Sequence, residues 1–195
     1  MTGIPDLIVL NESRWQKCQI TPSRELEVER VAAALVAPKA KALYQQIETT
    51  TSVPWWVIAV IHEREASQNF ACSLAQGDPW NQISTHQPRG IGPFQSFIDA
   101  AVFSLTRCAP YAAKWKDWTA GGTLTLLVLY NGTGYEQYHN EASPYDWGAT
   151  NIEQEGKYIA DRQWSATVWD QQIGCAAMLK SMMTLDPSIK FAEAA

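Results

Sequence analysis

Two carboxyl groups stand where an apolar stretch ends. In "VPWWVIAVIHEREASQNF", an almost unbroken apolar run finishes with Glu63 and Glu65. If this run is a helix, both acids meet the negative end of the helix dipole, and apolar neighbours withhold solvent from them. Both effects disfavour a charged carboxylate and raise its pKa. A carboxylic acid that stays protonated can donate the proton that a departing glycosidic oxygen needs. The stretch therefore offers a general acid.

Helical spacing does not choose between the two acids. Glu65 follows Ile61 by four residues and extends an inward apolar stripe, whereas Glu63 stacks on Ala59. The alternative is an ordinary solvated helix end, in which Arg64 pairs locally with a neighbouring carboxylate. On this stretch alone, both alternatives stay open.

A second carboxyl follows in the Gly/Pro-rich segment 71–95. Asp78, in "QGDPW", comes 13 residues after Glu65. It could orient a water as general base or steady positive charge on a sugar, or it could simply cap its own turn. Thr85 is a weaker candidate for holding that water. The glycines of "GIGPFQ", which ends at Gln95, would let backbone approach a ligand closely.

Metal and thiol chemistry find little support in the sequence. "HEREA" has Ala66 where the HExxH metalloprotease motif needs a histidine. His62, His86 and His139 have no ligand spacing, and no local signature pairs Cys72 with a histidine nucleophile partner. We therefore expect neither a metal nor another cofactor.

Composition excludes several classes of partner. The formal net charge is −5 without a basic stripe, which argues against nucleic acid as the ligand. No stretch approaches the ~20 apolar residues of a membrane span. The first 15 residues lack the basic start of a secretory signal, so we expect synthesis in the cytoplasm. Four scattered cysteines without a CxxC pair favour buried thiols over disulfides.

Aromatic residues are unusually frequent, with nine tryptophans and seven tyrosines. Most should lie in the core, because large aromatics dominate buried area. Several lie in Gly/Pro-rich segments, where a flat ring could stack on a sugar or simply pack the loop: Trp80, Tyr145, Trp147 and Trp164.

Apolar periodicity predicts a mainly helical single domain over residues 1–195. We expect an irregular lead-in at 1–22, a helical region from Ser23 interrupted at Pro38, and a frayed tail at 186–195. The apolar segment 119–131 is a helix or a buried strand by pattern alone. Further helices are predicted from Pro54 to about Ala66, over 96–108, in short form over 109–118, and from Val168 to about Met183, capped by Ser165 or Thr167.

Three motifs together resemble one enzyme family. "IAVIHEREAS" looks like the end of the catalytic helix in goose-type lysozymes and lytic transglycosylases. "GIGPFQ" resembles their Gly-Leu-Met-Gln turn, and "LYNGTGYEQY" resembles their Tyr-Asn-x-Gly motif. The three occur in the family's order. With "QGDPW", "SPYDWGATN" and "EGKYIADRQW", the chain looks most like lysozyme-like peptidoglycan hydrolases of phages, prophages and related bacteria.

The resemblance implies roles for individual residues. It implies that Glu65 and not Glu63 is the catalytic glutamate, and that Asp78 is a secondary acid. It also implies an all-α lysozyme-like fold with a cleft, in which residues 119–131 form a helix. Substrate contacts are then expected from Thr85, Gln95, Tyr130, Asn131 and Tyr158.

The function expected from the resemblance is a muramidase acting on peptidoglycan glycan strands, as in a bacteriolytic, antimicrobial phage endolysin. A lytic transglycosylase, a chitinase-like enzyme and a non-catalytic glycan-binding or virion component remain alternatives. We expect a monomer without a membrane span, delivered to the cell wall by a holin, a phage particle or a secretion system.

Overall fold

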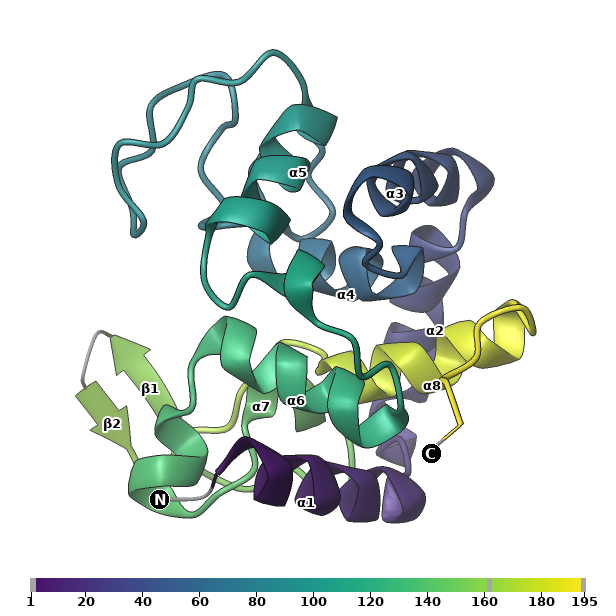
Figure 1. The fold of residues 1–195 in the computed structure, drawn as a ribbon. Coiled ribbons are helices and arrows are strands. Elements are labelled where there is room, and N and C mark those ends of the chain that lie inside the picture. Colours follow the sequence, from purple (N-terminus) through teal and green to yellow (C-terminus); the bar gives the residue numbers. More distant parts are fainter. Residues whose placement is uncertain (1–2, 161–162, 194–195) are drawn as a thin grey trace. The chain divides into compact units, whose positions relative to one another are not determined.

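The computed structural model describes residues 3–160 and 163–193, and within them the chain is mainly helical, as predicted (Figure 1). Two short strands, which the sequence did not predict, accompany the helices. The α-helices are α1 Ile4–Lys17, α2 Glu25–Leu35, α3 Pro38–Thr51, α4 Trp55–Ala66, α5 Phe97–Arg107, α6 Ala120–Asn131, α7 Pro144–Trp147 and α8 Cys175–Leu185. The short turns are η1 Pro22–Arg24, η2 Ala112–Lys114 and the π-helical η3 Tyr135–His139; the strands are β1 Lys157–Ala160 and β2 Gln163–Ser165.

The chain divides into two compact units. The first comprises residues 1–32 and 117–195, and the second comprises residues 33–116. Helix α2 crosses the division. Each unit contributes large, fully buried side chains, among them Leu124 and Trp147 in the first and Tyr44 and Ile58 in the second.

Helix α1 corrects the prediction of an irregular lead-in over residues 1–22, of which residues 1–2 lie outside the described part. It packs along α6 in the first unit (Figure 1). Asn11, fully buried, donates from Nδ2 to Thr125 Oγ1 at 3.1 Å. The Gly121 amide donates to Glu12 Oε2 at 2.8 Å, and its Cα lies against the Ile8 carbonyl, where a side chain would not fit. Tertiary packing on a glycine-bearing face thus stabilises a helix with a weak apolar stripe.

The C-terminal region also differs from the prediction. The last helix begins after Gly174 and not near Val168, and Ser165 and Thr167 do not cap it. The described part of the predicted frayed tail, 186–193, is packed, with Ile189 only 3% exposed. The Ala192 amide donates to the Trp118 carbonyl at 2.9 Å. Apolar burial and this hydrogen bond order the tail, while residues 194–195 lie outside the described part.

The second unit is built on α3, α4 and α5. Pro38 begins α3, as the predicted interruption requires, and Pro54 is the N-cap of α4. Ser96 caps α5 by accepting the Asp99 amide at 3.1 Å. Every residue of α4 from Trp55 to His62 is buried, so this helix forms the centre of the unit.

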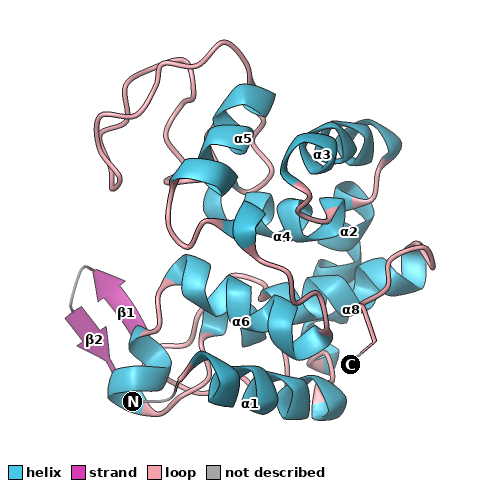
Figure 2. Cartoon of the chain, in the orientation of Figure 1, coloured by secondary structure: helices cyan, strands magenta, loops and turns pink. Residues whose placement is uncertain are grey.

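A long loop joins α4 to α5 and appears as an extended pink trace in Figure 2. Its own backbone hydrogen bonds order it: the Ser73 amide donates to the Asp78 carbonyl at 2.8 Å, and the Phe94 amide donates to the Trp80 carbonyl at 2.8 Å. Segment 71–95, predicted to be irregular, therefore lacks helices and strands but is ordered by its hydrogen bonds.

The first unit carries its own loop-rich segment after α6. Strands β1 and β2 pair antiparallel, with Tyr158 opposite Trp164. Residues 161–162 of the motif "EGKYIADRQW" lie outside the described part. Among the described residues, no helix is long and apolar enough to cross a membrane.

Candidate active site

Glu65 lies in the last turn of α4, directly after the buried core of that helix. Ser67 and Gln68 adopt left-handed backbone conformations and turn the chain away sharply. The Ser67 amide donates to the Glu63 carbonyl at 2.9 Å. Glu65 is partly buried, and it lies where the apolar helix ends and the long loop begins.

The environments of Glu63 and Glu65 differ. Burial raises the pKa of Tyr44, and the nearby charge of Glu63 raises it further. Glu63 therefore lies close to the buried Tyr44–His62 pair, in which the Tyr44 hydroxyl lies 2.9 Å from His62 Nδ1. The backbone of Glu65 instead contacts the long loop, because a Cβ added at Gly77 would lie 2.6 Å from the Glu65 carbonyl oxygen.

Gly77 makes this close approach possible. Its φ of +71° lies in the left-handed region that favours glycine, and the tight contact with Glu65 leaves no room for a side chain. The chain then continues directly into Asp78. The loop that carries Asp78 is thus in backbone contact with Glu65.

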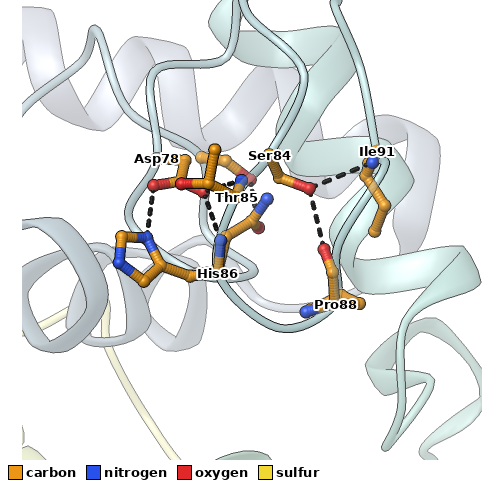
Figure 3. A network of polar contacts seen from close by, with 8 residues as sticks. Asp78, Ser84, Thr85, His86, Pro88 and Ile91 are labelled. Carbon is orange, nitrogen blue, oxygen red and sulfur yellow. Dashed lines mark hydrogen bonds and ion pairs between the residues drawn. The ribbon is translucent and has the colours of Figure 1, made fainter.

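Asp78 is held by three donors from its own loop (Figure 3). Its Oδ2 accepts the Thr85 amide at 2.7 Å and the His86 amide at 3.0 Å. Its Oδ1 lies 2.6 Å from His86 Nδ1. The hydrogen bond from the His86 amide, together with the imidazole and the Thr85 amide, lowers the pKa of Asp78 to about 2, so this carboxylate is ionised at neutral pH.

The turn that supplies these donors is closed by Ser84. Its hydroxyl donates to the Pro88 carbonyl at 2.8 Å and accepts the Ile91 amide at 3.0 Å (Figure 3). The alternative that Asp78 caps its own turn is therefore wrong, because its carboxylate accepts backbone amides 7 and 8 residues further along the chain.

The other predicted contacts in this unit have simpler surroundings. Thr85 is exposed and reaches Asp78 through its backbone amide. Gln95 is exposed just before the cap of α5 and is outside the Asp78 network. Gly92 approaches the Gln82 carbonyl of its own loop, so its close backbone contact is internal.

Tyr130, Asn131 and Tyr158 belong to the first unit. Tyr130 and Asn131 are the last residues of α6; Asn131 is exposed and donates from Nδ2 to Ser143 Oγ at 3.4 Å. The Tyr158 hydroxyl lies 3.0 Å from His139 Nε2. Its ring packs against Gly134.

Tyr158 is part of a ring cluster that spacing alone did not reveal. His139 stacks on Trp164, with ring centroids 3.6 Å apart and planes 10° apart. Tyr135 packs edge-on against both Tyr158 and Trp164, and its hydroxyl accepts the Tyr158 amide at 3.2 Å. Strand pairing, which sets Trp164 opposite Tyr158, brings these distant residues together.

The four aromatic residues considered for sugar stacking differ in how deeply they are buried. Trp147 and Tyr145 are buried, so they pack the core of the first unit. Trp80 is partly buried and donates from Nε1 to the Phe70 carbonyl at 2.8 Å. Trp164 is partly buried in the ring cluster. The packing interpretation holds for Trp147 and Tyr145.

His86 is the feature of this site that sequence reasoning considered only as a metal ligand. Within the described residues, no three His, Cys, Asp or Glu side chains gather as a metal ion would require. The pairing of His86 with Asp78 depends on the closed turn, so an Asp–His pair eight residues apart was its only sequence signal. The four cysteines all lie in the described part and are thiols, as predicted, but only Cys18 and Cys175 are buried, while Cys72 and Cys108 are partly exposed.

Searches of protein-family models, of curated proteins and of solved structures found no match to the chain.

Proposed function

We propose that this protein is a muramidase that cleaves the β-1,4 bond between N-acetylmuramic acid and N-acetylglucosamine, with Glu65 as general acid. One observation carries the proposal: two carboxyls in unlike surroundings lie on segments in backbone contact. Glu65 ends a buried apolar helix, whereas Asp78 is held ionised by three donors. Two carboxyls whose environments push their proton affinities apart are typical of glycosidic cleavage.

Glu65 is preferred to Glu63 because of what each one neighbours. The loop of Asp78 packs on the Glu65 backbone, whereas the charge of Glu63 acts on buried Tyr44. The general acid and the group that assists attack must act on the same sugar unit, which favours the residue beside the loop of Asp78.

Contacts to the glycan are proposed for polar groups of each unit, considered separately. Asn131 and Gln95 present exposed amides, which suit the hydroxyl and N-acetyl groups of a glycan strand. Thr85 is a further proposed contact in the second unit, and Tyr130 and Tyr158 are proposed for the first unit by itself. Partner and delivery follow the same proposal: the substrate is cell-wall glycan, reached through a holin, a phage particle or a secretion system.

The surroundings of Asp78 favour a second candidate reaction. Both of its oxygens already accept hydrogen bonds from the loop, so it is poorly available to activate water. Without a base for water, the 6-hydroxyl of muramic acid can attack instead and give an anhydro product, as in lytic transglycosylases. Mass spectrometry of the digest separates the two, because the anhydro end is lighter by one water.

The test is cleavage of purified peptidoglycan by the wild-type protein and by matched variants. Glu65→Gln is expected to lower the rate by about 100- to 10,000-fold, the usual contribution of a positioned acid. Glu63→Gln, two residues away, is the control and should stay within about threefold of wild type. Loss of activity in Glu63→Gln alone would overturn the assignment. Binding without cleavage by the wild type would favour a glycan-binding component instead.

A further inference from the structure

The Asp78–His86 pair has the geometry of an oriented imidazole. We infer that His86 is the base that takes the proton of the attacking water, and that Asp78 is the positioning residue that holds it. This inference rests on the proposed muramidase function and deepens it, because it assigns the group that makes cleavage a hydrolysis.

Asp78 itself is a poor base. Three donors already occupy its two oxygens, and its side chain is only 12% exposed. The same hydrogen bonds lower its pKa to about 2, and a carboxylate that binds protons so weakly takes little from water at neutral pH. Its geometry instead suits orientation of a neighbour.

His86 has what Asp78 lacks. Its Nδ1 faces Asp78 Oδ1 at 2.6 Å, while 74% of the side chain remains exposed. A carboxylate at one ring nitrogen fixes the proton there and leaves the other nitrogen with its lone pair. In His86 this leaves Nε2 as the acceptor. The main-chain amide of His86 also binds Asp78, so backbone and side chain are held by one carboxylate.

The pair is also tied to the acid. Gly77 precedes Asp78 and packs against the Glu65 carbonyl, with no space for a side chain between them. The hydrogen bond that His86 Nδ1 donates to Asp78 extends this connection by one further side chain. An inverting glycosidase needs its acid and base about 6.5–9.5 Å apart, with room for a water between them. The loop that carries His86 is anchored to the Glu65 backbone at Gly77.

The step balances as a single displacement. Glu65 gives its proton to the glycosidic oxygen as the bond from that oxygen to C1 of muramic acid breaks. A water oxygen attacks C1 from the opposite face, and one of its protons passes to His86 Nε2. The products are a 4-hydroxyl on N-acetylglucosamine and a new reducing end with inverted configuration. Solvent then removes the proton from His86 and restores the one on Glu65.

Kinetics on soluble peptidoglycan glycan strands test the assignment. His86→Gln is expected to lower kcat by about 100- to 10,000-fold with KM within about twofold. Gln82→Ala, also exposed in the same loop, should keep wild-type kcat and KM. In His86→Ala, added imidazole should restore part of the rate, because it replaces the missing base; a purely structural role would not respond. A wild-type rate in His86→Gln, or no recovery with imidazole, would overturn the inference.

Two further readouts complete the test. Asp78→Asn should lower kcat in the wild-type background and have little additional effect in His86→Gln, since it acts through that residue. Proton NMR of the first product should show the α-anomer; a β-anomer or an anhydro end would refute water activation by His86. If the wild type cleaves, Glu65→Gln does not and His86→Gln is normal, only this inference fails. If the wild type does not cleave peptidoglycan, the proposed function fails and the inference with it.

Discussion

The two loop-rich segments of this protein are organised around different groups. In the second unit, the loop between α4 and α5 closes around a carboxylate, Asp78, and a hydroxyl, Ser84. In the first unit, the segment after α6 is organised by the rings of His139, Tyr158 and Trp164. The first of these depends on hydrogen bonds to a charged group, and the second combines ring packing with hydrogen bonds such as that between Tyr158 and His139.

This difference predicts that the two segments respond differently to protonation and to the loss of an aromatic ring. Hydrogen bonds to an ionised group are lost when that group is protonated, whereas ring packing depends on buried area. The polar loop is also the one that presents candidate catalytic groups. Protonation should therefore affect the second unit more than the first, and loss of a ring should do the reverse.

The largest expected effect is a loss of folding stability in acid, which protonation of His62 causes in the second unit. Burial lowers the pKa of His62 from 6.5 to about 4, so between these values the unfolded chain binds a proton that the folded chain does not. The contribution of this shift to the free energy of unfolding is fully present above pH 6.5 and is lost as the pH falls to about 4. It amounts to at most roughly 3 kcal/mol. Denaturant unfolding at pH 7 and pH 4.5 should show less pH dependence in His62→Gln than in wild type.

A group in the first unit provides the contrast. Burial raises the pKa of Glu136, so the folded chain binds this proton at a higher pH than the unfolded chain does. The free energy of unfolding therefore rises as the pH falls from the raised pKa to the ordinary one. Glu136→Gln should remove this gain and make the acid sensitivity of the whole protein steeper. Equal effects of both variants on the pH dependence would contradict the contrast between the units.

Next in size is the ring cluster. Trp164→Ala removes the ring that stacks on His139 and packs against Tyr135 and Tyr158, and should cost about 2–3 kcal/mol, less than for a fully buried tryptophan. Tyr138→Ala, at a side chain 76% exposed, should change stability by less than about 0.5 kcal/mol. Chemical denaturation at pH 7 measures both. A larger effect of Tyr138 would show that the cluster is not what holds this segment.

A smaller, local effect is expected at the polar loop. Asp78→Asn removes the charge that the Thr85 and His86 amides share, and these amides should exchange with solvent about 10- to 100-fold faster. The Ile91 amide, bound to Ser84, is the internal control. In wild type the same protection should persist down to about pH 4 and fade toward pH 2, because the pKa of Asp78 is lowered from 3.8 to about 2. Unchanged exchange in the variant would show that the carboxylate does not order the turn.

The smallest effect concerns salt. The chain carries a formal net charge of −5, so long-range attraction does not capture an anionic wall polymer. Binding to peptidoglycan should change less than about twofold between 50 and 200 mM salt, because close contacts are little screened. A steep loss of binding with salt would instead point to a local basic surface as the contact.

Local signals in the sequence were sufficient for the central helices. The apolar run after Pro54 and the helical spacing over 96–108 each predict a helix that the structure has, whereas the pattern of 119–131 left helix and strand open. Thr119 accepts the Gly122 amide at 3.1 Å and so caps α6. These features depend on residues a few positions apart, so they can be read from the sequence.

Elements stabilised by distant partners were missed. Helix α1 depends on close packing against Gly121, and the hairpin depends on rings from the segment before it. The order of the tail depends on residues near Trp15 and Trp118, because Phe191 packs edge-on against Trp15 at 5.1 Å. Such contacts span long stretches of chain, and no local periodicity encodes them.

The candidate site likewise has features that the sequence determined and features that it did not. The sequence alone determined that an apolar helix ends in Glu63 and Glu65 and that Asp78 follows in a long loop. Only the tertiary structure decided that this loop packs on Glu65 and that Asp78 binds His86. The physical reason is that both pairings depend on how the loop closes: on the left-handed conformation of Gly77 and on a turn fastened by its own hydrogen bonds.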